Sequence, residues 1–138
     1  MKKALIAAII LLLLAIAVGG YFLLDHMFPV ASPIDCPNKE DIRSISLTQN
    51  SDPSTSVDVS DFEAVLQNIC AGEPTRIWSI QDYPSVESYY TVELNTLARQ
   101  YRYFVYADGS QVYVEKPYHG VYKVDQQVLD FFADYFRN

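Results

Sequence analysis

The feature that most constrains this chain is a run of 21 uncharged residues, Ala4–Leu24. A helix of that length rises about 30 Å at 1.5 Å per residue, which matches the hydrocarbon core of a bilayer. Lys2 and Lys3 precede the run and Asp25 follows it. This charge order predicts a cytoplasmic N-terminus and places the rest of the chain outside the cytoplasm. The sequence therefore predicts a single-pass protein that contacts the membrane through residues 4–24.

A cleaved secretory signal is the alternative interpretation of the same run. Two lysines, an apolar core from Ala4 to Leu14 and the small-residue pattern Ala15-Ile16-Ala17 occur in the order that such signals have. We favour a retained anchor because the apolar run continues through Tyr21–Leu24, beyond that pattern. Both interpretations export the remainder of the chain, either anchored to the membrane or secreted.

The exported part is acidic and long enough for one domain. The chain has 138 residues and a formal net charge of −7, and from Pro29 onward 8 Lys and Arg oppose 16 Asp and Glu. This balance disfavours nucleic acid as a partner, since nucleic-acid binding needs a basic surface. We expect an anchor over residues 1–25, a proline-containing stalk over 26–38 and an extracytoplasmic domain over 39–138.

Periodic apolar patterns in that domain predict alternating secondary-structure elements. Lys39–Gln49 alternates like a half-buried strand, and the polar cluster Asn50–Ser54 ends it. Ser60 and Glu63 have the spacing of a capping box, and apolar residues at helical spacing then continue to Cys70. Further strands are expected at Thr75–Ile80, Tyr89–Thr96, Tyr101–Ala107, Gln111–Lys116 and Val121–Val124, with a hairpin turn at Asp108-Gly109 and a terminal helix after Asp125. Hairpins rather than crossovers predict an α+β domain with a small, mainly antiparallel sheet and helices on one face.

Two cysteines, Cys36 and Cys70, lie beyond the apolar run. An oxidising compartment permits a disulfide between them, which would join the start of the domain to its first helix. The alternative is that Cys70 is a small buried side chain on the apolar face of that helix and Cys36 is free.

Catalytic chemistry has little support in the sequence. The two histidines are His26, at the end of the apolar run, and His119, in an expected turn. They and the two cysteines lack zinc-ligand spacing, and no calcium loop or phosphate-binding glycine loop occurs. We therefore expect no enzyme activity, no metal and no cofactor.

Two segments are dense in polar residues and in residues with special backbone geometry, Glu73–Pro84 and Tyr113–Tyr122. With these motifs the chain resembles a "domain of unknown function" family of small, membrane-anchored, exported proteins of Gram-positive, Clostridia-like bacteria. That resemblance implies no activity. The matching residues are Pro74, Thr75, Ser79, Ile80, Asp82 and Pro84, and then Tyr113, Glu115, Pro117, Tyr118, Gly120 and Tyr122.

These motifs allow a functional and an architectural interpretation. In the functional one, a single face for recognition combines a planar guanidinium, a carboxylate and rigid aromatic rings. Its residues are Arg76, Trp78, Glu115, Tyr118 and Tyr122. In the architectural one, turn and packing roles account for the motifs, with Thr75, Ser79, Asp82, Pro84, Pro117 and Gly120 as the structural positions.

The leading functional expectation is an anchored extracytoplasmic interaction module that recognises a protein or a cell-envelope component. A small envelope hydrolase that uses paired carboxylates is one alternative. An accessory subunit that acts through its transmembrane helix is another. The sequence leaves the oligomeric state open.

Overall fold

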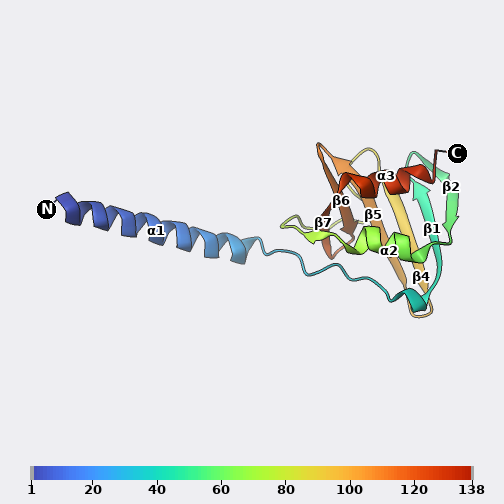
Figure 1. Ribbon diagram of the computed structural model, residues 1–138, viewed down its shortest axis with the longest axis horizontal. Coiled ribbons are helices and arrows are strands. Elements are labelled where there is room, and N and C mark those ends of the chain that lie inside the picture. Colours follow the sequence, from blue (N-terminus) through green and yellow to red (C-terminus); the bar gives the residue numbers. More distant parts are fainter. Residues whose placement is uncertain (1, 138) are drawn as a thin grey trace. The chain divides into compact units, whose positions relative to one another are not determined.

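The computed structural model describes residues 2–137, in two units, Met1–Val30 and Ala31–Asn138. The first unit contains helix α1 (Lys2–Met27), which is coloured blue in Figure 1. This helix is long and apolar enough to cross a membrane, and a signal sequence near the N-terminus would pass the same test. The predicted long apolar helix is therefore confirmed. Its retention as an anchor stays a prediction.

The second unit is built on one seven-stranded sheet with the order β2-β1-β4-β5-β6-β7-β3. All neighbouring strands are antiparallel. The strands are β1 (Ile42–Gln49), β2 (Asp52–Val59), β3 (Glu73–Pro74), β4 (Tyr90–Thr96), β5 (Gln100–Asp108), β6 (Gln111–Lys116) and β7 (Gly120–Val124). The predicted α+β class with an antiparallel sheet is confirmed.

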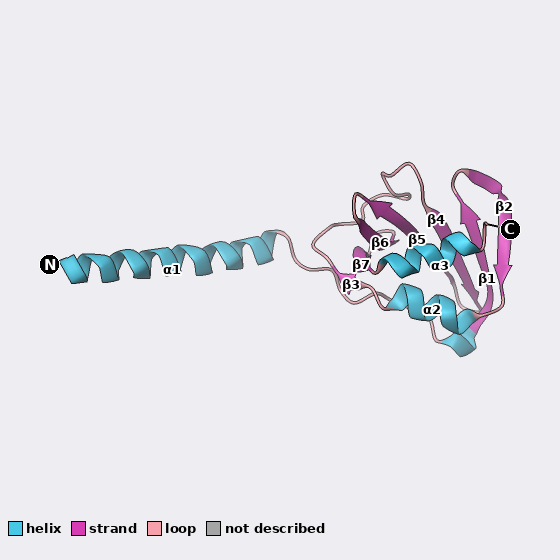
Figure 2. Ribbon diagram, turned by 45° about the horizontal axis from the view of Figure 1, so that its top comes forward, coloured by secondary structure: helices cyan, strands magenta, loops and turns pink. Residues whose placement is uncertain are grey.

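Two helices, α2 (Phe62–Cys70) and α3 (Gln126–Asp134), cover one face of this sheet (Figure 2). Each presents an apolar stripe, and α2 buries Val65 and Ile69 there while α3 buries Phe132. The strands supply the other half of this core because alternate residues point to the same face. These strand residues include Ile45, Leu47, Val92, Leu94, Tyr103, Val105, Val114 and Tyr122.

Strand β2 was not expected, because its first three residues lie in the predicted turn Asn50–Ser54 and the sequence predicts no element over residues 55–59. It pairs with β1 at the edge of the sheet, and most of its side chains are exposed. An edge strand with a solvated face needs no apolar alternation, so the residue pattern of β2 does not indicate a strand.

The prediction of a strand over Thr75–Ile80 is wrong, since β3 ends at Pro74. Before β1, Lys39–Asp41 form a short 3-10 turn rather than strand.

The start of α2 also differs from the capping-box prediction. The side chain of Asp61, not that of Ser60, accepts a hydrogen bond from the Ala64 amide, at 3.0 Å. Glu63 pairs instead with Lys39 at 2.6 Å. An Asp next to a Ser offers a second capping oxygen, and the carboxylate is the stronger acceptor at the positive end of a helix.

Residues Ala31–Pro37, which we call the strap, belong to the second unit rather than to a separate stalk. The Ala31 amide donates to the Thr75 carbonyl at 2.9 Å. Two buried tyrosines donate to strap carbonyls, Tyr122 to Ser32 at 2.7 Å and Tyr103 to Asp35 at 2.6 Å. These strap carbonyls have no partner within a sheet or helix, so the tyrosine hydroxyls satisfy them. These hydrogen bonds hold the proline-containing strap against the core.

A disulfide joins Cys36 to Cys70, at the C-terminal end of α2. It ties the strap to the helical face of the domain. Of the two alternatives that the sequence left open, the structure therefore contains the bridge.

Candidate functional site

The two sequence motifs meet on the face of the sheet that the helices do not cover. Residues Thr75–Tyr89, which we call the covering loop, begin beside β7, where the Thr75 hydroxyl donates to the Val121 carbonyl at 2.7 Å. Further along, the rings of Tyr83 and Tyr89 pack on Phe104 of β5, with centroid distances of 5.8 and 5.3 Å. The loop therefore closes a second, smaller apolar layer over the sheet.

Glu115 lies inside this second layer and fastens the covering loop to the sheet. Its side chain accepts a hydrogen bond from the Ser79 hydroxyl at 2.7 Å and another from the Tyr106 hydroxyl at 3.0 Å. Burial and the negative charge of Glu115 raise the pKa of Tyr106. Both groups are buried, so the predicted place of Glu115 on an exposed recognition face is corrected to an internal, structural one.

Tyr122 is also internal, contrary to its predicted place on that face. Its side chain is fully buried in the helix-side core, and its hydroxyl reaches the strap carbonyl of Ser32. Burial raises the pKa of this phenol. Gly120, two residues earlier, leaves room for the strap, because a Cβ atom there would lie 2.7 Å from the Cβ of Ala31. The second motif thus holds the strap in place.

Tyr118 is the exposed residue of the second motif, and its backbone is unusual. Its φ is 59°, in the left-handed region that non-glycine residues rarely occupy. The His119 amide donates to the Lys116 carbonyl at 3.1 Å, so Pro117 and Tyr118 are the central residues of a turn. Proline followed by a positive φ fits a type II turn, in which glycine normally takes the place of Tyr118. Such backbone geometry is concentrated at functional positions.

The Tyr118 hydroxyl donates to the Asp82 carboxylate at 2.6 Å, which joins the turn to the covering loop. This hydrogen bond raises the pKa of Tyr118. The ring itself stays exposed, beside a cavity of about 280 Å³. We call this cavity the basic pocket. Its lining residues are Asp82, Arg99, Gln100, Tyr101, Arg102, Lys116, Pro117 and Tyr118.

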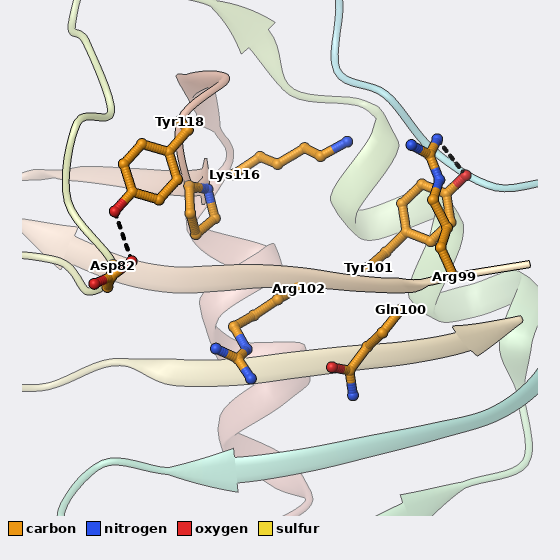
Figure 3. Close-up of a pocket in the computed structure, with 8 residues that line it drawn as sticks. Asp82, Arg99, Gln100, Tyr101, Arg102, Lys116 and Tyr118 are labelled. Carbon is orange, nitrogen blue, oxygen red and sulfur yellow. Dashed lines mark hydrogen bonds between the residues drawn. The ribbon is translucent and has the colours of Figure 1, made fainter.

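The residues that line the basic pocket come from three segments of the chain, and two of these segments supply its cations and aromatic rings (Figure 3). Arg102 and Gln100 extend on the side of β5 opposite Arg99 and Tyr101. Tyr118 and Asp82 stand at one end, and Arg99 and Tyr101 at the other. The Arg99 guanidinium lies 4.3 Å from the centre of the Tyr101 ring and donates to its hydroxyl at 2.7 Å. Lys116 reaches between these two ends. Three of the eight basic residues that follow Pro29 therefore line one cavity of an acidic domain.

Acidic partners hold these cations in position. Asp35 of the strap pairs with Lys116 at 2.5 Å and with Arg99 at 3.0 Å. The hydrogen bond and the positive charge of Lys116 lower the pKa of Asp35, with a smaller contribution from Arg99. On the other side, Arg102 pairs with Glu93 of β4 at 2.7 Å. Arg99 and Arg102 keep about half of their side chains exposed, whereas Lys116 is largely enclosed.

The structure thus brings the two motif segments together but divides the predicted recognition residues. Arg76, Trp78 and Tyr118 are exposed, while Glu115 and Tyr122 are internal. Sequence reasoning missed Arg99, Tyr101, Arg102 and Lys116 as one group. A weak signal was present in Arg99-Gln100-Tyr101-Arg102, where two of the few basic residues flank a tyrosine.

The remaining motif positions have architectural contacts. Thr75, Ser79 and Asp82 donate or accept the hydrogen bonds described above. Pro84 is buried in the covering loop, Pro117 begins the turn, and Gly120 admits the strap.

The fold and the pocket define a small α+β domain that follows an apolar helix, with a strap and a covering loop that complete its two faces. Residues 30–123 match the family DUF5301, which is described as "Domain of unknown function (DUF5300)", and the chain belongs to this family. The match begins at the strap, so the strap is part of the family's domain. The expected resemblance to an uncharacterised domain family is confirmed at this coarser level.

A solved structure from Ruminococcus gnavus, described as "NMR structure of the protein from Ruminococcus gnavus", is similar to this chain. The two share 28% sequence identity with a TM-score of 0.57, over 70% of this chain and 99% of that one. No curated protein matches the chain. These relatives support the fold and the family, and their descriptions state no activity.

Proposed function

We propose that the chain is a membrane-anchored, extracytoplasmic binding module that has no chemistry of its own. In this proposal residues 4–24 span the membrane, as the lysines before them and the length of the apolar run favour. The domain binds an acidic protein or cell-envelope component in the basic pocket. The resemblance to anchored, exported proteins of Gram-positive bacteria supports the same location.

The observation that carries this proposal is that Arg99, Arg102, Tyr101 and Tyr118 all line one cavity. A guanidinium presents a planar fork of donors that matches a carboxylate or phosphate group. The two rings add rigid contact area at a low cost in conformational entropy. A ligand that carries an acidic group beside a ring or an apolar chain would satisfy both features.

The ion pairs already present do not prevent this binding. The Arg102–Glu93 pair and the Arg99–Asp35 pair are partly exposed to water, and such pairs contribute only about 0–1 kcal/mol. An incoming acidic group can therefore share or replace these partners at low cost. Lys116 is more enclosed and keeps its contact with the strap, so we assign ligand contact to the two arginines.

Affinity capture with the full chain tests the proposal. The immobilised protein is incubated with solubilised cell envelope, and the captured component is eluted by raising the ionic strength, which screens contacts between charges. Two variants remove pocket chemistry with little effect on the fold. Arg102→Gln removes the charge, and Tyr118→Asn removes the ring but keeps a residue that tolerates a left-handed backbone.

We expect Arg102→Gln to weaken binding of the captured component about ten- to a hundredfold, since a hydrogen bond to a charged group contributes about 1.5–3 kcal/mol. We expect Tyr118→Asn to weaken binding as well, because the contact area of the ring is lost. Arg43→Gln is the matched control, because Arg43 lies on β1 outside the basic pocket. Equal binding by the parent, both pocket variants and the control would show that the pocket is not the binding site.

A further inference from the structure

Exposed apolar side chains are concentrated on one part of the domain. Among the described residues of the second unit, six large apolar side chains are exposed. Five of them belong to the covering loop and to the turn bonded to it, namely Ile77, Trp78, Ile80, Tyr83 and Tyr118. Scattered single exposures are ordinary, whereas a cluster of this kind marks an interaction surface.

The hydrogen bonds of the loop hold these side chains outward. The Ser79 hydroxyl points inward to Glu115, so its neighbours Trp78 and Ile80 project away from the sheet and are 61% and 70% exposed. Nearer the strap, the Thr75 hydroxyl accepts a hydrogen bond from the Ile77 amide at 3.1 Å. The apolar side chains therefore stand on a backbone that is fixed to the domain.

Residues 28–30, which we call the tether, connect α1 to the strap. The strap meets the domain beside the first segment of the covering loop. The Ala31 amide is bonded to the Thr75 carbonyl, two residues before Ile77. Only residues 28–30 lie between Ala31 and the last residue of α1, Met27. Four Cα–Cα steps cover at most about 14 Å. When α1 spans a bilayer, the covalent chain therefore limits how far Ile77 and Trp78 can lie from the lipid surface.

We propose that Ile77, Trp78 and Ile80 insert into the headgroup region of the bilayer that α1 crosses, so that the domain lies on the lipid surface. This inference rests on the anchor of the proposed function and goes beyond its pocket. Tryptophan favours the interface because its ring is apolar and its N–H group stays hydrated. Charge does not oppose insertion at the segment Arg76–Tyr83, where Arg76 and Asp82 balance; Glu87, which is also exposed, lies beyond the buried Pro84. Tethering raises the local concentration of lipid, so weak insertion is sufficient.

Trp78 is the single tryptophan of the chain, so its fluorescence reports on this loop alone. The full chain is reconstituted into phosphatidylcholine vesicles that contain no other protein, with and without lipids brominated near the headgroup. We expect bromine to lower the Trp78 emission at least twofold, and we expect iodide in the buffer to quench it less than it quenches free tryptophan. Co-flotation with the vesicles separately reports the insertion of α1.

Two variants distinguish insertion from mere proximity. Ile77→Ser combined with Ile80→Ser leaves the tether and Trp78 in place, and we expect it to remove at least half of the quenching by brominated lipid. Leu97→Ser is the matched control, because Leu97 is an exposed apolar residue of the β4–β5 connection, and it leaves the quenching unchanged.

Floating protein whose Trp78 is unquenched by bromine would overturn the inference and leave the anchor standing. Quenching that persists unchanged in the double serine variant would also overturn it, because the apolar loop would then add nothing to the tether. A chain that does not float would remove the anchor and this inference together. None of these results depends on the basic pocket, which the capture experiment tests.

Discussion

At the scale of single residues, a few side chains determine how the strap and the loop attach to the sheet. Gly120 is one of them, since its missing side chain lets Ala31 approach β7. Tyr122 is another, because its buried ring carries a hydroxyl that reaches the Ser32 carbonyl. The second motif therefore needs a glycine for steric room and a tyrosine for a hydrogen bond. In both cases the partner residue lies about 90 positions earlier in the chain.

Gly120→Ala tests this close approach. The new Cβ would lie 2.7 Å from the Cβ of Ala31 and 3.2 Å from the Tyr122 hydroxyl oxygen. We expect the free energy of unfolding to fall by about 1–3 kcal/mol, the usual cost of overpacking. Urea denaturation of the full chain in detergent, followed by Trp78 fluorescence, measures it. A second substitution, Ala31→Gly, should restore part of the loss, and full stability of Gly120→Ala alone would contradict the account.

At the scale of elements, the meander from β4 to β7 and the helices α2 and α3 follow from local patterns that the sequence displays. Strand β2, the strap and the covering loop do not. Strand β2 and the strap contain few apolar residues, and most of the large apolar side chains of the covering loop are exposed. Backbone groups of the strap and the loop find partners on distant residues, as the Ser32 carbonyl does on Tyr122 and the Thr75 amide does on Val121. Periodicity detects elements that bury one of their own faces, so it misses segments that other elements hold.

Loss of the disulfide tests how far the strap depends on a covalent tie. Cys36 and Cys70 are 34 residues apart. For a loop of that length the chain-entropy model gives about 3–4 kcal/mol. We expect the Cys36→Ser/Cys70→Ser variant to lose about that amount in urea denaturation. A reducing agent should lower the wild type to the level of the variant and leave the variant unchanged. A wild type that is insensitive to reduction would argue against the bridge as a source of stability.

At the scale of the whole molecule, ion pairs connect the strap, the sheet and the basic pocket. Asp35 connects them, because it pairs with Lys116 of β6 and with Arg99 before β5. The same contacts that hold the strap also orient the cations of the basic pocket. Folding and the proposed binding site are therefore linked through one carboxylate.

This link predicts how stability depends on pH. Asp35 has a pKa below its ordinary value of 3.8 when folded, so it binds a proton more readily when unfolded. Its contribution to stability is present above about pH 4 and is lost as the pH falls through the lower, folded value. We expect the stability advantage of the wild type over Asp35→Asn to shrink below about pH 4 in urea denaturation series. The exposed Asp58→Asn is the control, and an advantage that stays constant into acid would refute the role of Asp35.

The candidate site was only partly predictable. The motifs Glu73–Pro84 and Tyr113–Tyr122 were recognised as special, and the structure does bring them together. Their individual roles were not predictable, because a carboxylate such as Glu115 looks the same in a sequence whether it is buried or exposed. In the structure, its burial and its hydrogen bonds to Ser79 and Tyr106 identify it as an internal group.

The sequence alone determined the long apolar helix, the α+β class, the antiparallel meander and the two amphipathic helices. These features depend on charge, on apolar periodicity and on local turn chemistry, all of which operate over a few neighbouring residues. Tertiary structure decided the attachment of the strap, the closed second face and the basic pocket. Each of these depends on contacts between residues far apart in the chain, such as Asp35 with Lys116 and Asp82 with Tyr118. Such contacts depend on how the strap and the loops pack on the sheet, and local sequence patterns do not predict them.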